Sequence, residues 1–220
     1  MSESREDSEA GTPLDPDGLD PGTSVLVAGP ALSDKRRLMF DLVGGAPDRS
    51  ALLVTTKKRT EQLRSSFLDS RADPDAWTVS MVDCVSRTGG FGSVSDTADV
   101  KYLSSARDLT GIGIAVSGFM RECYHDDGRT GTRVGLHALS TLLMYTELRR
   151  VYQFMHVLTS RIGHSGFEGV FTLDTTNRDG DDVAMLSQVV DSVVEVRDTD
   201  SGPELRVRGD SFGPRAWTPF

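Results

Sequence analysis

Short apolar runs alternate along the chain with segments whose apolar residues repeat at helical spacing, and this alternation constrains the fold more than any other feature. Strands are predicted at residues 24–29, 51–55, 77–83, 132–138, 167–174, 192–197 and 204–208. Helices are predicted at residues 33–44, 59–68, 109–123, 140–162 and 182–190. The pattern favours an α/β fold with a mainly parallel central sheet covered on both faces and a C-terminal antiparallel hairpin. A chain of 220 residues with 37% apolar residues suits one such domain.

Small polar residues and glycines predict where several of these helices begin and end. Ser33 is a candidate N-cap and Gly44 a candidate C-cap of the first helix. Ser140 is a candidate cap of a single long helix at residues 140–162. Residues 84–107 are rich in Ser, Gly and Asp, which predicts a long loop that is either functional or mobile.

The two ends of the chain differ in composition from its middle. The first 22 residues combine acids and glycines with Pro13, Pro16 and Pro21, and they cannot bury enough apolar area to offset the entropy of ordering. We therefore expect a disordered acidic tail at residues 1–22, one domain at residues 23–210 and a C-terminal tail at residues 211–220.

Acidic residues outnumber basic ones by 33 to 24, which gives a net charge of −9. This excess disfavours general binding to nucleic acid or to anionic lipid. Asp is favoured over Glu and Arg over Lys, which is typical of a protein that stays soluble in concentrated salt, and we expect a halophilic source. No apolar run is long enough to span a membrane and the first residues carry no export signal, so we expect a cytoplasmic protein.

The sequence contains two cysteines, Cys84 and Cys123, which lie too far apart for a CxxC motif. Neither a disulfide framework nor a zinc ribbon is indicated, and we expect reduced thiols that are mostly buried. Cys123, His125, Asp126 and His137 could in principle collect a metal ion, but no pair among them has a recognised ligand spacing. We therefore expect no metal site.

The order of these elements resembles the RecA-type P-loop ATPase core, and within it the KaiC-like branch found in archaea. The resemblance covers about residues 22–210 and implies a RecA-like three-layer sandwich. The segments that carry it are VLVAGPALSDKRRLMFDLV at the Walker A position, ALLVTTKKRTEQL at the second strand, DLTGIGIAVSGFM, RVGLHALSTLLMY at the Walker B position, YQFMHVLTSRI and VVDSVVEVR.

Within this resemblance the Walker A motif is degenerate. A P-loop has the pattern G-x-x-x-x-G-K-[ST], in which the second Gly lets the amides close on the phosphates and the hydroxyl binds Mg²⁺. Gly29 and Lys35 match the pattern, whereas Asp34 replaces the second Gly and Arg36 replaces the hydroxyl residue. A carboxylate at about 4 Å from a phosphate charge repels it by roughly 4 kcal/mol at an effective dielectric constant of about 20. Asp34 is either a built-in substitute for phosphate at the helix N-terminus or an ordinary acid of the first turn.

Two further elements of the resemblance depart from the family pattern. His137 stands where the Walker B strand carries the Asp that helps to hold Mg²⁺, and Lys57 and Lys58 stand where KaiC-like ATPases carry a Glu pair that orients the attacking water. A charged ammonium group is a donor only and cannot act as that base. The resemblance therefore implies a pseudo-ATPase with no catalytic residues and no cofactor, with ATP as the alternative ligand.

Three of the four lysines, Lys35, Lys57 and Lys58, fall at positions that surround the nucleotide in the RecA-type fold. With Arg36 they predict a basic pocket in an acidic protein, able to hold an anion, a magnesium-free nucleotide or an acidic partner segment. The alternative is that solvated lysines meet at a surface loop by chance.

Together these features predict a catalytically degenerate RecA/KaiC-like domain that acts as a regulatory or protein-interaction module, in signalling or in the control of gene expression by analogy with the family. The alternative is an atypical nucleotide-binding ATPase that uses Lys35 and is completed at a subunit interface, which would make the protein a homo-oligomer. A DNA-associated RecA relative is a third hypothesis, which the net charge weakens. The sequence does not identify the protein partner.

Overall fold

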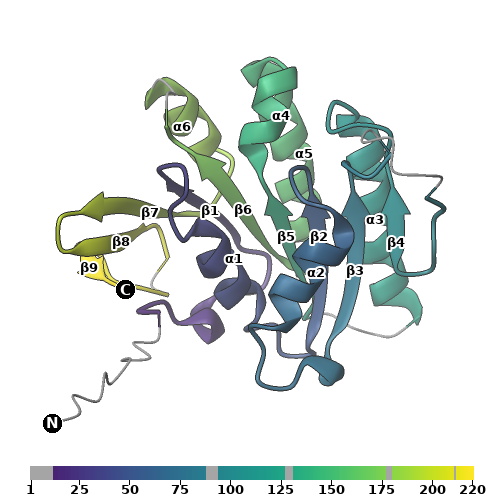
Figure 1. The fold of residues 1–220 in the computed structure, drawn as a ribbon, viewed down its shortest axis with the longest axis horizontal. Helices are drawn as coiled ribbons and strands as arrows, with labels where there is room; N and C mark the ends of the chain where they lie inside the picture. The colour runs from purple at the N-terminus through teal and green to yellow at the C-terminus, as the bar shows by residue number, and fades with distance from the viewer. Residues whose placement is uncertain (1–11, 88–93, 127–130, 177–179, 211) are drawn as a thin grey trace, which may run out of the picture.

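The computed structural model describes residues 12–87, 94–126, 131–176, 180–210 and 212–220. These residues form one sheet in the order β4-β3-β2-β5-β6-β1-β7-β8-β9 (Figure 1). Its strands are β1 (Ser24–Gly29), β2 (Ser50–Thr55), β3 (Thr78–Asp83), β4 (Val100–Tyr102), β5 (Arg133–His137), β6 (Glu168–Asp174), β7 (Ser192–Thr199), β8 (Gly202–Arg208) and β9 (Thr218–Pro219). Pairing is parallel from β4 to β7 and antiparallel from β7 to β9. The predicted fold class is confirmed.

Helices cover both faces of the sheet. They are α1 (Lys35–Val43), α2 (Thr60–Leu68), α3 (Leu109–Asp126), α4 (Leu139–Tyr145), α5 (Leu148–Ser165) and α6 (Gly180–Ser187). Leu38 and Leu42 of α1 and Phe67 of α2 are buried against one face, with Val27 and Leu53 of the sheet. Helices α3 to α6 pack on the other face of the sheet (Figure 1). The strand residues that are buried there alternate, along strands such as β1 and β2, with the residues that are buried on the first face. This arrangement is the three-layer sandwich of a RecA-like fold.

The parallel register brings four loops to one edge of the sheet. Gly29 at the end of β1 pairs with Asp174 at the end of β6, and Thr55 at the end of β2 pairs with His137 at the end of β5. Since β5 pairs with β6, the carboxyl ends of all four strands lie together. In open α/β sheets this edge is where ligands bind.

The helix ends differ from the prediction at two places. Ser33 does not cap α1; its hydroxyl donates to the Pro30 carbonyl (2.9 Å), and Asp34 occupies the N-cap position instead. The long helix expected from Ser140 is two helices, because Thr146 has extended backbone angles (φ −140°, ψ 139°). The break redirects the chain, so that α4 and α5 both place apolar residues in the core. The predicted C-cap at Gly44 is confirmed.

The Ser-, Gly- and Asp-rich segment contains a strand that the sequence did not predict. β4 pairs in parallel with β3, and of its three residues only Val100 is buried. One buried apolar residue is too weak a signal to identify a strand. Part of the same segment, residues 88–93, lies outside the described residues.

Both ends of the described chain belong to the fold, contrary to the expected tails. Leu14 and Leu19, on either side of the 3₁₀ turn Pro16–Gly18, are each 5% exposed and pack in the core that α1 covers. The Asp15 amide donates to the carbonyl of Phe212, which is fully buried (2.7 Å). The expectation of disorder is therefore wrong for residues 12–22, while residues 1–11 lie outside the described part.

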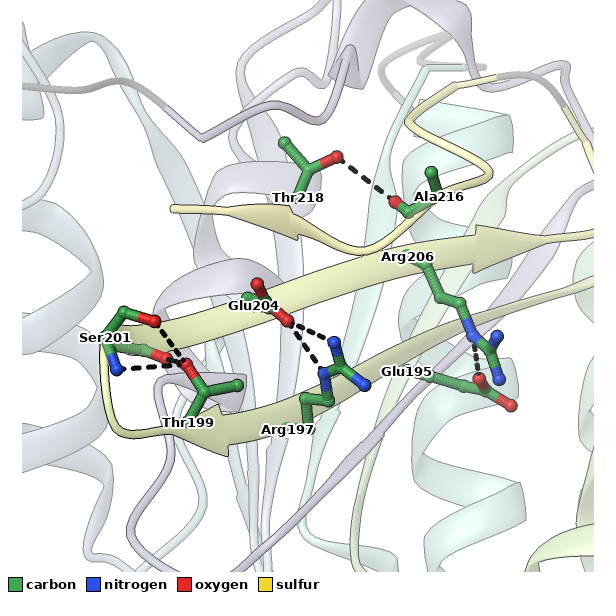
Figure 2. A network of polar contacts seen from close by, with 9 residues as sticks. Glu195, Arg197, Thr199, Ser201, Glu204, Arg206, Ala216 and Thr218 are labelled. Atoms are coloured by element: carbon green, nitrogen blue, oxygen red, sulfur yellow. Dashed lines mark hydrogen bonds and ion pairs between the residues drawn. The ribbon is translucent and has the colours of Figure 1, made fainter.

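The C-terminal strand is held over the β7–β8 hairpin by side chains. Arg197 and Arg206 place their guanidinium groups 4.2 and 4.4 Å from the centre of the Trp217 ring. Figure 2 shows the ion pairs that fix these arginines, from Arg197 to Glu204 and from Arg206 to Glu195. Residues 212–220 are therefore not a free tail.

Among the described residues, no helix is both long and apolar enough to cross a bilayer.

Candidate functional site

The candidate site lies at the carboxyl edge of the sheet, where the loop between β1 and α1 meets the ends of β2, β5 and β6. The loop runs from Gly29 to Lys35, the segment that the sequence resemblance assigns to the Walker A position. It packs tightly, since a Cβ atom on Gly29 would lie 2.7 Å from Cβ of Val196 on β7. Only glycine fits at this point, which agrees with the close approach of loop and sheet.

Lys35 is buried, and its ammonium group is bonded inside its own loop. Nζ donates to the Pro30 carbonyl oxygen and to Oγ of Ser33 (2.9 Å). Burial lowers the pKa of Lys35, and the carboxylates of Asp174 and Asp198 act in the opposite direction. The ammonium group of Lys35, which the resemblance aligns with the P-loop lysine, is thus bonded to its own loop.

Thr176, just after β6, occupies another group of the same loop. The Ala31 amide donates to Oγ1 of Thr176 (2.6 Å), and the Thr175 amide donates to the Gly29 carbonyl (2.8 Å). In a P-loop, backbone amides of this segment cradle phosphate. In this chain the Ala31 amide is satisfied from within the protein.

Asp34 stands at the N-cap position of α1 with an exposed side chain. Its carboxylate accepts no capping hydrogen bond from the described part of the helix. The hypothesis that Asp34 replaces a bound phosphate at the helix N-terminus needs such a bond, whereas the ordinary first-turn acid does not. The geometry therefore favours the second description of Asp34.

His137, at the end of β5, lies within the electrostatic influence of several cations. Its Nδ1 lies 3.1 Å from Oγ1 of Thr172 on β6. Burial lowers the pKa of His137 to about 4, and the positive charges of Arg36, Lys57, Lys58 and Lys35 act in the same direction. The imidazole is consequently neutral at pH 7.

The peptide between His137 and Ala138 is cis, and Thr56 holds it in place. The Ala138 amide donates to Oγ1 of Thr56 (2.9 Å), and the hydroxyl donates to the Ala138 carbonyl (2.8 Å). The loop after β2 is thereby fastened to the end of β5.

Lys57 and Lys58 follow Thr56 in this fastened loop. Lys57 is exposed, and Lys58 donates its amide to Oγ1 of Thr55 (3.1 Å). Partial burial lowers the pKa of Lys58, with the charges of Arg36 and Lys57 acting in the same direction. The structure thus brings together the five basic residues that the sequence singled out: Lys35, Arg36, Lys57, Lys58 and His137.

The sequence did not indicate a place in the site for four polar residues: Thr176, Asp174, Asp198 and Ser33, the last of which was expected only to cap a helix. Asp174 and Thr176 had one available signal, because polar residues directly after a buried strand lie at the edge where ligands bind. Asp198 carried no such signal, since it lies far along the C-terminal hairpin.

The described ranges hold no group of three or more His, Cys, Asp or Glu residues placed to bind a metal ion. The side chains of His125 and Asp126 fall outside the described part of the structure. Cys84 and Cys123 are not joined in a disulfide bond. Burial raises the pKa of the Cys84 thiol to about 12, with Asp83 and Asp108 adding to the shift, so the nucleophilic thiolate is scarce at neutral pH.

Comparison with known proteins gives a family and a fold. The model of a family of unknown function (DUF7504) matches residues 22–196. None of the curated proteins matches. Among solved structures, the chain resembles a KaiC-like protein from the hyperthermophilic archaeon Pyrococcus horikoshii OT3 with a TM-score of 0.60 and 15% sequence identity, over 90% of this chain and 84% of that one. At this identity the likeness concerns the fold alone.

Proposed function

We propose that this chain, which belongs to the DUF7504 family of unknown function, is a RecA/KaiC-like domain that has lost ATP hydrolysis and acts as a regulatory or protein-interaction module. The observation that carries the proposal is the bonding of Lys35. Its ammonium group is buried and paired with Pro30 and Ser33 of its own loop, so it does not extend toward the space that the outer phosphates would occupy.

The chemistry of the neighbouring positions supports the same proposal. Mg²⁺ needs oxygen ligands, but Arg36 and His137 offer a cation and a neutral imidazole at the two positions of the Walker ligands. Activation of the attacking water needs an acceptor, but Lys57 and Lys58 are donors. Three parts of the catalytic apparatus are therefore altered together, which favours a lost activity over a changed one.

Lys35, Arg36, Lys57 and Lys58 suit the binding of an anion without Mg²⁺, beside the neutral imidazole of His137. Candidate ligands are a small anion, a magnesium-free nucleotide and an acidic segment of a partner protein. An ordinary role as solvated lysines at a loop is the alternative. Signalling and the control of gene expression remain the cellular settings that we propose by analogy with the fold.

An atypical ATPase, completed by residues of a second subunit, is the second candidate function. The retained Lys35 and Gly29 at the Walker A position favour it. It requires Lys35 to leave its bonds to Pro30 and Ser33 when nucleotide binds. Binding to DNA is a weaker candidate because of the net charge of −9.

We expect the purified protein, assayed in molar KCl with Mg²⁺, to hydrolyse ATP and GTP no faster than the background. The physical reason is that no carboxylate stands at the Mg²⁺ or water-orienting positions. Phosphate release over several hours is the measurement, with the Lys35→Ala variant as the control. Turnover that is present in the natural protein and disappears in Lys35→Ala would establish the second candidate function instead.

We also propose that the protein is cytoplasmic and adapted to high salt, because acids are in excess and lysines are few. Self-repulsion of the acidic surface is screened in molar salt and emerges as screening is removed. The melting temperature should therefore fall as KCl is lowered from molar concentrations to about 0.1 M. Differential scanning fluorimetry across this range measures the effect. A constant melting temperature would contradict salt adaptation.

A further inference from the structure

Helices α3 and α5 lie side by side and leave an open groove of about 860 Å³ on the surface of the domain. Apolar side chains line it although they face solvent. Ile114 of α3 is 67% exposed, and Val157 of α5 and Tyr145 at the end of α4 are each 50% exposed. Large apolar side chains gathered in one exposed groove mark an interaction surface more often than scattered ones do.

A glycine of α3 lines the groove. A Cβ atom at Gly113 would meet only the Phe154 ring, at 4.0 Å, so there is open space at this position. Arg161 of α5 crosses to α3, where Nη1 donates to Oγ of Ser117 (2.5 Å). The two helices are thus tied together, and the groove between them is not filled by their own side chains.

The groove carries a small excess of positive charge, with three arginines against two acids in its lining, although the protein as a whole is acidic. Helix α5 carries three arginines and no acidic residue, in a chain of net charge −9. Arg150, Arg161 and Arg107 line the groove, and the Arg107 guanidinium lies 5.1 Å from the centre of the Tyr145 ring.

Two acids, Asp108 and Glu147, also line the groove. Asp108 is partly engaged at the start of α3, because its carboxylate accepts the Gly111 amide (2.8 Å). The groove therefore offers exposed apolar side chains and a margin in which arginines outnumber acids.

We propose that this groove binds an amphipathic helix of a partner protein whose apolar stripe is flanked by acidic residues. A groove between two adjacent helices matches the ridges of a third helix, and apolar anchors at helical spacing would fill it. The arginines would attract acidic flanks and disfavour basic ones. A second copy pairing through the same face would bring together two grooves with the same small excess of positive charge, so an acidic helix is electrostatically the better match.

This inference concerns a different surface from the basic pocket at the carboxyl edge of the sheet, and it gives the proposed interaction module a specific partner chemistry. The test uses fluorescein-labelled helical peptides of about 18 residues, with leucines at positions i, i+3, i+4 and i+7 and glutamates on both flanks. A matched set carries lysines in place of the glutamates. Binding to the full chain is measured by fluorescence anisotropy at two KCl concentrations.

We expect glutamate peptides to bind at least about tenfold more tightly than lysine peptides, and to bind more weakly as KCl rises. Val157→Asp should weaken binding by about tenfold or more, because it places a carboxylate among the exposed apolar side chains opposite the acidic peptide. Arg150→Glu should weaken it by a smaller factor. Both side chains are exposed, so circular dichroism and melting temperature should show an unchanged fold.

The matched control is Arg215→Glu, which alters an exposed arginine outside the groove and should leave the affinity unchanged. Equal binding of both peptide sets, no binding of either, or indifference to Val157→Asp would overturn the proposal. A dimer in sedimentation velocity that Val157→Asp dissociates would also overturn it, in favour of a second copy as the occupant. ATP hydrolysis by the natural protein would refute the proposed loss of activity without affecting the peptide result, so the two failures are distinguishable.

Discussion

Replacing Asp83 with alanine is expected to lower the free energy of unfolding by about 3 kcal/mol or more. Asp83 ends β3 and its side chain is fully buried. One carboxylate oxygen accepts the amide and hydroxyl of Thr60 and the hydroxyl of Ser86, and the other accepts the amides of Val85 and Ser86. Alanine would leave these donors without an acceptor in a buried place, and α2 would lose the group that binds its first amide.

The same contacts give the stabilisation a defined pH dependence. Burial alone would raise the pKa of Asp83, but the hydrogen bonds from Ser86, Val85 and Thr60 outweigh it and hold the pKa below the ordinary value of 3.8. The folded state therefore favours the ionised carboxylate. Its contribution is fully present above the pKa of the unfolded chain and is lost as the pH falls through the lower pKa of the folded state.

Urea unfolding of the natural protein and of Asp83→Ala, followed by circular dichroism in molar KCl, measures both effects. The difference between the two proteins should be constant near neutral pH and should shrink below about pH 3.8. Asp75→Ala, which removes an exposed carboxylate, is the control and should change stability by less than about 0.5 kcal/mol. A loss as small as the control's would show that the Asp83 network contributes little.

The sequence predicts the centre of this fold well because a central parallel strand is marked by its own residues. β1 and β2 are continuous apolar runs that end in polar or small residues, and β5 and β6 are mainly apolar runs that small or polar residues interrupt; burial on both faces produces that pattern directly. β4 and β9 are very short, and they are strands only because they pair with β3 and β8. Their own sequences therefore carry little signal for a strand. The break at Thr146 is of the same kind, because the apolar stripe of α4 continues into α5 and conceals it.

The ends of the chain show how composition can mislead. Residues 12–22 look unable to fold because acids, glycines and prolines dominate them. Leu14 and Leu19 nevertheless hold the segment against the domain, because they are buried in the same core cluster as Phe212, which comes from the other end of the chain. A contact between positions so distant in sequence has no local signature.

In the candidate site, too, the features with a local sequence signal could be predicted and those that depend on distant contacts could not. Lys35, Arg36, Lys57, Lys58 and His137 could be placed together because each belongs to a strand-end segment whose position in the fold is recognisable. The bond from the Ala31 amide to Thr176 could not be predicted, since it joins residues 145 positions apart. Nor could the inward turn of Lys35, which depends on where one hydroxyl and one carbonyl lie in the folded loop.

Removing the charge of Asp34 and restoring a hydroxyl at position 36 should raise the affinity for nucleotide. In the Asp34→Gly, Arg36→Thr double variant, a carboxylate no longer faces the phosphates, and a threonine can bind Mg²⁺. Repulsion of about 4 kcal/mol would correspond to roughly a thousandfold in affinity at moderate dielectric, and molar salt reduces it. Lys35 must also release Pro30 and Ser33 to reach a phosphate, so we expect a gain of at least about tenfold.

Isothermal titration with Mg-ATP in molar KCl, on the natural protein, both single variants and the double variant, separates the two contributions. Asp34→Gly alone should account for the electrostatic part, and Arg36→Thr should add to it only when Mg²⁺ is present. Hydrolysis should stay absent in all of them, because Lys57, Lys58 and His137 still provide neither a base nor a carboxylate ligand. If the double variant gained no affinity, charge would not be what keeps nucleotide out. The closed loop, with Lys35 bonded inward and the Ala31 amide held by Thr176, would then be the cause.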